Sequence, residues 1–376
     1  MKQVKLLAQS VGSIALVFTI ILSAILSTNV FKISGFGTYD GPIFDVHVNA
    51  EAMNEALLRT FMSNLQQVGI TKAVLNGWDE SVDPSFKIMR FKQLYPDRII
   101  PSLYFGPQPY QANSTRALLS AENAYDKGFR MFGEMLLKHL DDAAIPADDP
   151  NVLKIFDIAA KRHMPVLVHH DRDYAEIERA LEHNRNATII FHGWRCSWTQ
   201  CDFSPSGFRK LLLKHLNLVI ALDTLRFPWV GAVFVDPSTG ILRNDWKKLF
   251  EGMPYRFVVG SDFYDPEKDF TLESVKSFAN LYRGMLGQLS PEVARRIAYQ
   301  NLEDLLARET SLTSTSSAAV TTHAVETVEI AKTITIATSS IAVSNWLQTN
   351  WEYIVIVPII FAIVMILVAR VPRKRR

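Results

Sequence analysis

The stretch Ile43-Phe-Asp-Val-His-Val48 is typical of a buried β-strand, because apolar and β-branched residues occupy most of its positions. Seven further β-rich runs follow it at intervals of roughly thirty residues. Amphipathic helical patterns follow the runs, for example over residues 51–68, 152–163 and 273–285, and a last pattern covers 291–306. The seven runs cover residues 72–76, 99–104, 130–135, 166–169, 188–192, 218–222 and 256–260.

Eight strand–helix units predict an α/β protein with a (β/α)8 barrel, the TIM-barrel fold, over residues 40–308. A doubly wound parallel sheet is the alternative. That fold usually carries a Gly-rich phosphate-binding loop after its first strand, and no such loop follows residue 48. We therefore expect the barrel, with any active site at the carboxyl ends of its strands.

The composition of the 376-residue chain excludes several classes of protein. A hydrophobic fraction of 48% excludes a disordered chain, and two cysteines are too few for a disulfide scaffold. The formal net charge is +2, but eight of the 40 Lys and Arg residues lie in residues 1–32 and 370–376. The remaining 32 face 38 Asp and Glu residues, so the body of the chain is acidic and no nucleic-acid partner is expected.

Residues 1–32 have the pattern of a signal peptide or a retained signal-anchor helix. No charged residue lies between Lys5 and Lys32, and Ile, Leu, Val and Phe dominate residues 14–26. A cleavable signal ends in small residues, whereas Leu22-Ser-Ala24 places a large residue where a small one is wanted. Cleavage and retention therefore both stay open.

The other end of the chain is typical of a stop-transfer helix. Residues 353–369 carry no charge, tryptophans precede them, and the basic tail 372–376 follows. Aromatic residues at one interface and basic residues at the other predict a transmembrane helix over residues 351–371, with the tail in the cytoplasm.

The composition changes to Ser, Thr, Ala and Val over residues 309–345, which predicts an extracytoplasmic stalk. Asn113-Ser-Thr115 and Asn186-Ala-Thr188 are N-glycosylation sequons, although such triplets also arise by chance. We therefore expect a glycoprotein at the cell membrane, with its catalytic domain outside the cytoplasm and the lipid bilayer around its terminal helices.

Polar side chains gather at the carboxyl ends of the expected strands. A lone histidine in such a place is more often a structural residue than a ligand. Imidazoles and carboxylates from several strands, directed at one barrel mouth, instead supply the donors that a divalent ion needs. Without a metal ion, a buried polar cluster is costly unless every group has a partner. The residues are Asp45, His47, Glu134, His169, His170, His192 and Asp262.

Five motifs on these strands resemble the amidohydrolase superfamily. The most similar branch is the amidohydrolase-related (amidohydrolase 2) family, and the TatD-type metal-dependent hydrolases are a more distant relation. The resemblance covers essentially all of residues 43–308. The motifs are Phe44-Asp-Val-His-Val-Asn49, Gly128-Phe-Arg-Met-Phe-Gly-Glu134, Pro165-Val-Leu-Val-His169, Ile190-Phe-His-Gly193 and Val259-Gly-Ser-Asp262.

The resemblance implies a metal-dependent hydrolase and a role for each motif residue. His47 and His169 would bind the metal ion, and Glu134 would bridge or support it. His192 would bind metal or substrate. Asp262 would join the ligands and take a proton from the water that the ion activates. The implied substrate is a small molecule with an amide, ester, lactone or phosphoester bond.

One position departs from the family pattern, which has a second histidine where this chain has Asn49. An amide oxygen is a weaker ligand for zinc than imidazole, so we expect lower metal affinity or a preference for a harder ion. Either one divalent ion stays, with zinc our first choice, or the barrel has lost its metal ion and its activity. We favour the first interpretation because the other four ligand positions are filled.

Two further functions are compatible with the same motifs. Some relatives perform metal-dependent, non-oxidative decarboxylation on a similar site, which would make the protein a lyase. A catalytically inactive barrel that binds a ligand is the other alternative.

The loop after the sixth strand holds both cysteines and two aromatic residues. Outside the cell, Cys196 and Cys201 are expected to form a disulfide that stiffens this loop, with a free or metal-binding pair as the alternative. Trp194 and Arg195 would then line the substrate pocket, where Arg195 suits an anionic group; the alternative is that Trp194 packs on the core.

Three residues on other loops are weaker candidates for the rim of the active site, namely Trp78, Asp79 and Asp223. His170 is ambiguous, because neighbouring residues on a strand point to opposite faces and only one of His169 and His170 can face the barrel interior. We expect His169 to face inward, and His170 either reaches substrate from the following loop or packs.

Overall fold

A computed structural model describes residues 37–77, 84–106, 111–139, 143–171, 175–192, 204–223, 234–236 and 239–311. The chain divides into two units, Met1–Ser317 and Ala318–Arg376, and all described residues belong to the first. The predicted N-terminal signal or anchor segment and the transmembrane helix lie outside the described residues, as does the predicted stalk beyond Ser311. None of the described helices is long and apolar enough to cross a membrane.

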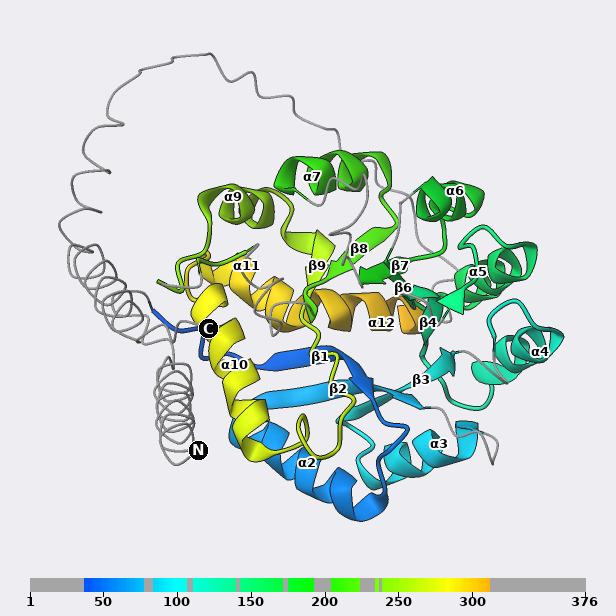
Figure 1. Cartoon of the computed structure of the whole chain (residues 1–376), viewed down its shortest axis with the longest axis horizontal. Helices are drawn as coiled ribbons and strands as arrows, with labels where there is room; N and C mark the ends of the chain where they lie inside the picture. The colour runs from blue at the N-terminus through cyan, green and yellow to red at the C-terminus, as the bar shows by residue number, and fades with distance from the viewer. Residues whose placement is uncertain are drawn as a thin grey trace, which may run out of the picture. The chain divides into compact units, whose positions relative to one another are not determined.

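Eight parallel strands with helices around them form a nearly closed barrel (Figure 1). Each strand pairs with the next along the chain, and a two-residue strand β5 (Ala143–Ala144) pairs antiparallel with β4. The (β/α)8 barrel predicted from the spacing of the β-rich runs is therefore confirmed. The eight strands are β1 (Ile43–Asn49), β2 (Ile70–Gly77), β3 (Ile99–Phe105), β4 (Met131–His139), β6 (Val166–His170), β7 (Ile189–His192), β8 (Leu218–Ala221) and β9 (Phe257–Val258).

The barrel closes where β1 meets the residues around and after β9. The Val46 N–H donates to the Val259 oxygen at 2.9 Å, and the Asp262 N–H donates to the His47 oxygen at 2.9 Å. Asp45 strengthens this seam, since its Oδ1 accepts from the Ser261 N–H at 2.9 Å. Burial raises the pKa of Asp45 to about 6, although the hydrogen bonds that its carboxylate accepts from Ser261 and from the His47 N–H act against the rise. Asp45, predicted among the polar strand ends, thus bonds the backbone of the seam.

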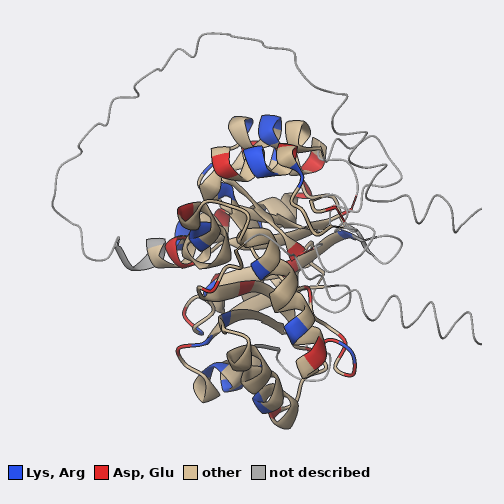
Figure 2. Cartoon of the chain, turned by 90° about the vertical axis from the view of Figure 1, so that its left-hand side faces the viewer, with Lys and Arg blue, Asp and Glu red and all other residues tan. Residues whose placement is uncertain are grey.

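Five of the outer helices, α2, α4, α5, α7 and α10, begin after a residue whose side chain caps them. Asn54 accepts from the Leu57 N–H, so the helix predicted from residue 51 begins at Glu55. Basic and acidic residues both occur along these helices and loops (Figure 2). The helices are α2 (Glu55–Gln67), α3 (Pro84–Leu94), α4 (Thr115–Ala124), α5 (Pro150–Arg162), α6 (Ala175–His183), α7 (Pro205–Lys214), α9 (Asn244–Gly252) and α10 (Leu272–Leu286), with a short 3-10 helix η2 (Pro254–Arg256) before β9.

The last helical segment closes one end of the barrel. It consists of α11 (Pro291–Arg295), a π-helical turn η3 (Arg296–Gln300) and α12 (Asn301–Ser311), so the helix continues three residues past the predicted domain end at 308. Leu302 and Leu305 of α12 pack into an apolar cluster with residues near the start of each strand, such as Phe44. The amino ends of the strands are therefore filled by side chains, and the carboxyl ends are left for a site.

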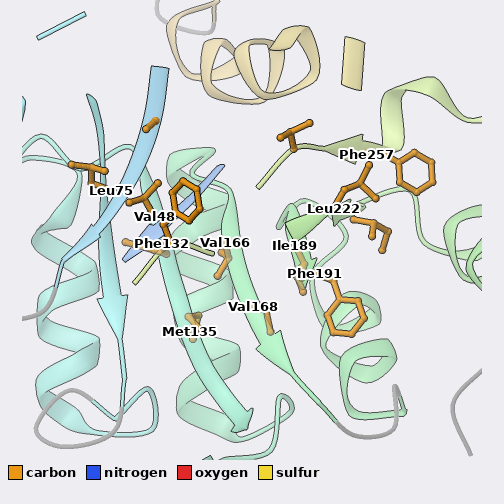
Figure 3. Close-up of a cluster of buried hydrophobic side chains, with 14 of the residues drawn as sticks. Val48, Leu75, Phe132, Met135, Val166, Val168, Ile189, Phe191, Leu222 and Phe257 are labelled. Carbon is orange, nitrogen blue, oxygen red and sulfur yellow. The ribbon is translucent and has the colours of Figure 1, made fainter. Parts of the chain in front are cut away.

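Strand alternation separates this inner cluster from a larger apolar layer between strands and helices (Figure 3). On β6, Val166 and Val168 belong to the outer layer, while Leu167 belongs to the inner cluster. The next inward position is His169. The same alternation on β7 places His192 on the inner side after Ile190.

Truncating Leu302 should destabilise the barrel. The side chain is 1% exposed, so Leu302→Ala leaves a cavity at the closed end and should lower the free energy of unfolding by about 2–5 kcal/mol. The matched control is Leu216→Ala, because Leu216 is 82% exposed and its truncation should cost less than about 0.5 kcal/mol. Urea unfolding measures both; equal losses would show that α12 does not seal the barrel.

Candidate metal centre

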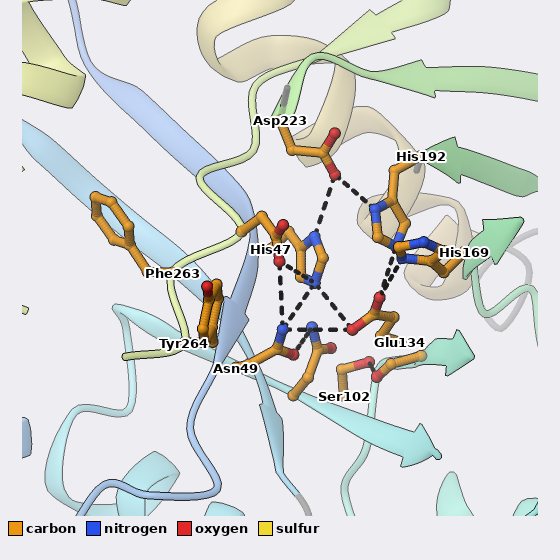
Figure 4. Close-up of polar contacts among 12 residues, drawn as sticks. His47, Asn49, Ser102, Glu134, His169, His192, Asp223, Phe263 and Tyr264 are labelled. Carbon is orange, nitrogen blue, oxygen red and sulfur yellow. Dashed lines mark hydrogen bonds and ion pairs between the residues drawn. The ribbon is translucent and has the colours of Figure 1, made fainter. Parts of the chain in front are cut away.

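Three imidazoles from three strands meet at the carboxyl end of the barrel (Figure 4). They belong to His47 of β1, His169 of β6 and His192 of β7. The ring centroids of His47 and His192 lie 4.4 Å apart, and those of His169 and His192 lie 4.5 Å apart. All three side chains are at least 95% buried. The structure thus brings together the three histidines that the sequence placed on separate strands.

The carboxylate of Glu134 lies between the three rings. Its Oε1 is 2.8 Å from Nδ1 of His169 and 3.1 Å from Nε2 of His192. Its Oε2 is 3.4 Å from Nε2 of His47. Each imidazole therefore directs one nitrogen toward the same buried carboxylate.

Glu134 reaches this position where the β4 ladder is irregular. The pairing with β6 shifts between Phe132 and Met135, so strict alternation does not hold there. Gly133 has a φ of +118°, and a Cβ at this residue would lie 2.5 Å from the Leu167 oxygen. Only glycine fits this backbone, which explains the Gly-Glu pair that the motif carries.

A second carboxylate holds the outer nitrogen of each imidazole. Oδ2 of Asp223 lies 3.2 Å from Nδ1 of His47 and 2.8 Å from Nδ1 of His192. Oδ1 of Asp171 lies 3.1 Å from Nε2 of His169. In a neutral imidazole, a carboxylate on the outer nitrogen favours the tautomer whose N–H points outward, and the inner nitrogen of that tautomer carries the lone pair.

Electrostatics in this cluster follow from its burial and its charges. Burial alone would raise the pKa of Glu134, but the charges of His47 and His192 and a hydrogen bond to His169 hold it well below its usual value. Burial alone would lower the pKa of His47, but Glu134 and Asp262 hold it well above its usual value. The pKa of His169 is likewise raised, to about 9, because its bonds to carboxylates outweigh burial.

The residues present fit a divalent cation. With its outer nitrogen protonated, His192 directs the lone pair of Nε2 toward Oε1 of Glu134 at 3.1 Å, which is unfavourable unless a cation or an extra proton lies between them. Nε2 of His192 and Oδ1 of Asp223 are buried and lack a hydrogen-bond partner among the described residues. Imidazole and carboxylate are ligands that zinc and other divalent transition metals accept.

Two groups of described side chains place their ligand atoms within 4.8 Å of one another. One consists of Glu134, His169 and His192, and the other of His47, His192 and Asp223. We favour the first, because Asp223 bonds the outer nitrogens and so orients the rings, whereas Glu134 faces their inner nitrogens.

Asn49 and Asp262 complete the cluster on the β1 side. Nδ2 of Asn49 lies 3.3 Å from Oε2 of Glu134 and 3.5 Å from Oδ1 of Asp262. Oδ1 of Asp262 lies 3.7 Å from Nε2 of His47. Burial raises the pKa of the Asp262 carboxyl, which its negative neighbours also favour, while His47 acts against the rise.

His170 lies apart from these residues. Its Nε2 is 3.1 Å from Oε2 of Glu176 on α6, so the side chain faces the helical layer and His169 faces the barrel interior. This position gives no support to the predicted contact of His170 with substrate. The predicted pocket residues Trp194 and Arg195 lie outside the described residues, as do the other loop residues named earlier, Cys196, Cys201, Trp78 and Asp79.

Sequence reasoning missed two residues and undervalued a third. Asp171 and Asn76 were not singled out, and Asp223 was only a rim candidate, although it bonds two of the three histidines. Asp171 directly follows β6, and Asp223 follows β8 by two residues. Their position at strand ends was a usable signal. Asp171 contacts His169 of the strand that it follows, whereas the two histidines that Asp223 contacts lie on other strands.

The sequence matches no protein-family model and no curated protein. Among solved structures, it is similar to a TatD homologue from Escherichia coli, with 12% identity, 71% of this chain and 97% of that chain covered, and a TM-score of 0.51. Two examples of matches with a TM-score below 0.5 follow. They are 4-oxalomesaconate hydratase from Rhodopseudomonas palustris (14% identity, 72% and 97% covered, 0.43) and a TatD-family hydrolase from Entamoeba histolytica (9%, 71% and 99%, 0.45).

At 12% identity, the similarity to the TatD homologue shows the fold alone. The resemblance that the five motifs suggested is therefore confirmed at the level of the barrel.

Removing the charge of Asp223 should weaken cation binding. Asp223→Asn loses the carboxylate that orients two imidazoles, and the loss of such an outer partner typically lowers metal affinity by about 10- to 100-fold. Calorimetric titration with zinc measures this change in affinity. The matched control is Asp157→Asn, since Asp157 also contacts a histidine, His183 at 3.1 Å, but on the surface. Equal zinc affinities in the two variants would contradict the orienting role.

Proposed function

We propose that this protein is a metal-dependent hydrolase that acts on a small molecule with an amide, ester, lactone or phosphoester bond. The observation that carries the proposal is the convergence of three imidazoles on Glu134 while Asp171 and Asp223 hold their outer nitrogens. Such an arrangement orients imidazole ligands for a cation.

Glu134, His169 and His192 would hold one divalent ion, and zinc suits this ligand set. When bound, the ion supplies a Lewis acid that polarises a carbonyl or phosphoryl oxygen and makes water a stronger nucleophile. Three protein ligands leave a coordination position open, as catalytic zinc sites do.

Asp262 is placed to move the proton. Its side chain is 15% exposed, compared with 7% for Glu134 and 1% for Asp223, so it is the most accessible of the three carboxylates. Burial raises its pKa, which makes the carboxylate a better base than an ordinary aspartate. It can take a proton from water and return it to the leaving group.

We also propose that the protein is held at the cell membrane with its barrel outside the cytoplasm. Four features of the sequence support a barrel anchored outside the cytoplasm. They are the apolar segments at residues 14–26 and 353–369, the Ser/Thr-rich segment between the barrel and the second apolar segment, and the basic tail.

Replacing the proposed base should reduce turnover while leaving the cation in place. Asp262→Asn should lower kcat by about 10²- to 10⁴-fold, the usual contribution of general base catalysis. The assay is hydrolysis of a panel of esters, lactones, amides and phosphoesters by the full-length protein, before and after chelation. The control is Asp265→Asn, because Asp265 lies on the same loop and its carboxylate contacts the exposed Lys268 side chain and the backbone N–H groups of Glu267 and Lys268.

An unchanged rate in Asp262→Asn would exclude Asp262 as the base. Carbon dioxide released from a carboxylated substrate would indicate the decarboxylase instead. A folded, metal-free protein without activity on any member of the panel would indicate a ligand-binding barrel.

Deleting the second apolar segment should release the protein from membranes. We expect the full chain to sediment with membranes and to stay there in alkaline carbonate, whereas a chain ending at residue 345 with its N-terminal segment cleaved should be soluble. Sedimentation of both proteins measures this. A full chain that is soluble without detergent would contradict the anchor.

A further inference from the structure

We infer that the side-chain amide of Asn49 takes the place of a second cation, so that the barrel mouth holds one divalent ion and not two. This inference rests on the proposed function and specifies how many ions the site takes. It concerns the half of the cluster formed by His47, Asn49 and Asp262. In Figure 4, His47 and Asn49 lie beside the half formed by His169 and His192.

The amide nitrogen of Asn49 faces three acceptors. Nδ2 lies 3.3 Å from Oε2 of Glu134, 3.5 Å from Oδ1 of Asp262 and 3.3 Å from Nε2 of His47. An NH₂ group carries two hydrogens, so it can bond both carboxylates at once. Nε2 of His47 accepts a hydrogen bond when the ring is neutral and its proton lies on the nitrogen beside Asp223.

The opposite side of the amide has the matching partner. Oδ1 of Asn49 lies 3.5 Å from Nδ2 of Asn76 on β2. Turning the Asn49 amide over would place its oxygen against two carboxylate oxygens and its NH₂ against the NH₂ of Asn76. The hydrogen-bond network therefore assigns the orientation with NH₂ inward.

These contacts remove the need for a cation on this side. Glu134 and Asp262 would repel each other across the β1 side of the site, and a cation would normally relieve that repulsion. The two N–H groups of Asn49 relieve it without a charge. In agreement, both groups of described side chains that could hold a cation include His192, and neither includes Asp262.

The two halves of the site thus have different roles, one in binding an ion and the other in hydrogen bonding. Glu134 joins them, because Oε1 faces His169 and His192 while Oε2 faces Asn49 and His47. The first half offers lone pairs to an ion. The second half is satisfied by hydrogen bonds, which leaves Asp262 free of metal and available for proton transfer.

Zinc stoichiometry of the full-length protein tests this inference. After equilibrium dialysis with zinc, we expect one ion per wild-type chain and two per Asn49→His chain, because imidazole offers a ligand where the amide offers only hydrogens. Elemental analysis reads the number without any assay of activity. The matched control is Asn123→His on the exposed face of α4, which adds a histidine away from the site and should leave one ion.

A second variant tests the hydrogen bonds even if Asn49→His does not fold. Asn49→Asp has the same shape but replaces the NH₂ group by an oxygen, so three carboxylates meet without a donor. In chelator its Tm should fall by about 5 °C or more relative to wild type. Zinc should then raise the Tm of this variant more than that of wild type, because a second ion now has ligands.

Two ions in the wild type would overturn the inference, and so would an Asn49→Asp variant as stable as wild type in chelator. A single ion in a folded Asn49→His variant would also overturn it. No bound zinc in the wild type would remove the proposed function itself. The chelator experiment separates these cases, since it reports on the amide and the carboxylates without any cation.

Discussion

The carboxylate of Glu134, buried among three imidazoles, is the constraint on which the site depends. A carboxylate in such surroundings is costly unless positive charge or hydrogen-bond donors surround it on every side. The barrel meets this requirement by directing β1, β6 and β7 toward one point at its carboxyl end. The irregular ladder at Gly133 brings Glu134 to the same point from β4. The opposite end can be filled by α12 because the chemistry lies at the other end of the strands.

Around Glu134 the residues form two layers with separate tasks. The imidazoles lie inside, and the carboxylates of Asp171 and Asp223 lie behind them on the outer nitrogens. Outer carboxylates determine which nitrogen offers a lone pair, so they control the inner layer without facing its centre. On the β1 side, Asn49 gives the site a neutral donor where the related family pattern has imidazole. The result is an asymmetric site in which one side can bind an ion and the other is held by hydrogen bonds.

Much of the fold could be predicted because strand and helix periodicities are local properties of the chain. All eight strands lie where the β-rich runs are, and errors occurred at element ends, where caps such as Asn54 decide the first helical residue. The inward direction of His169 and the outward direction of His170 also follow from alternation. The positions of His47 and Glu134 do not, because the ladders of β1 and β4 are irregular just before these residues.

The sequence by itself determined the barrel, the residues at its strand ends and the departure from the family pattern at Asn49. It also carries the apolar and basic segments from which the membrane anchor is predicted. Only the tertiary structure decided which atoms face one another: that Asp223 bonds two histidines from different strands, that Asp171 supports His169, and that the Asn49 amide turns its NH₂ group inward. The physical reason is that such a contact depends on the distance and direction between two atoms. No local sequence pattern encodes either, whether the residues lie far apart in the chain, as Asp223 and His47 do, or two apart, as His169 and Asp171 do.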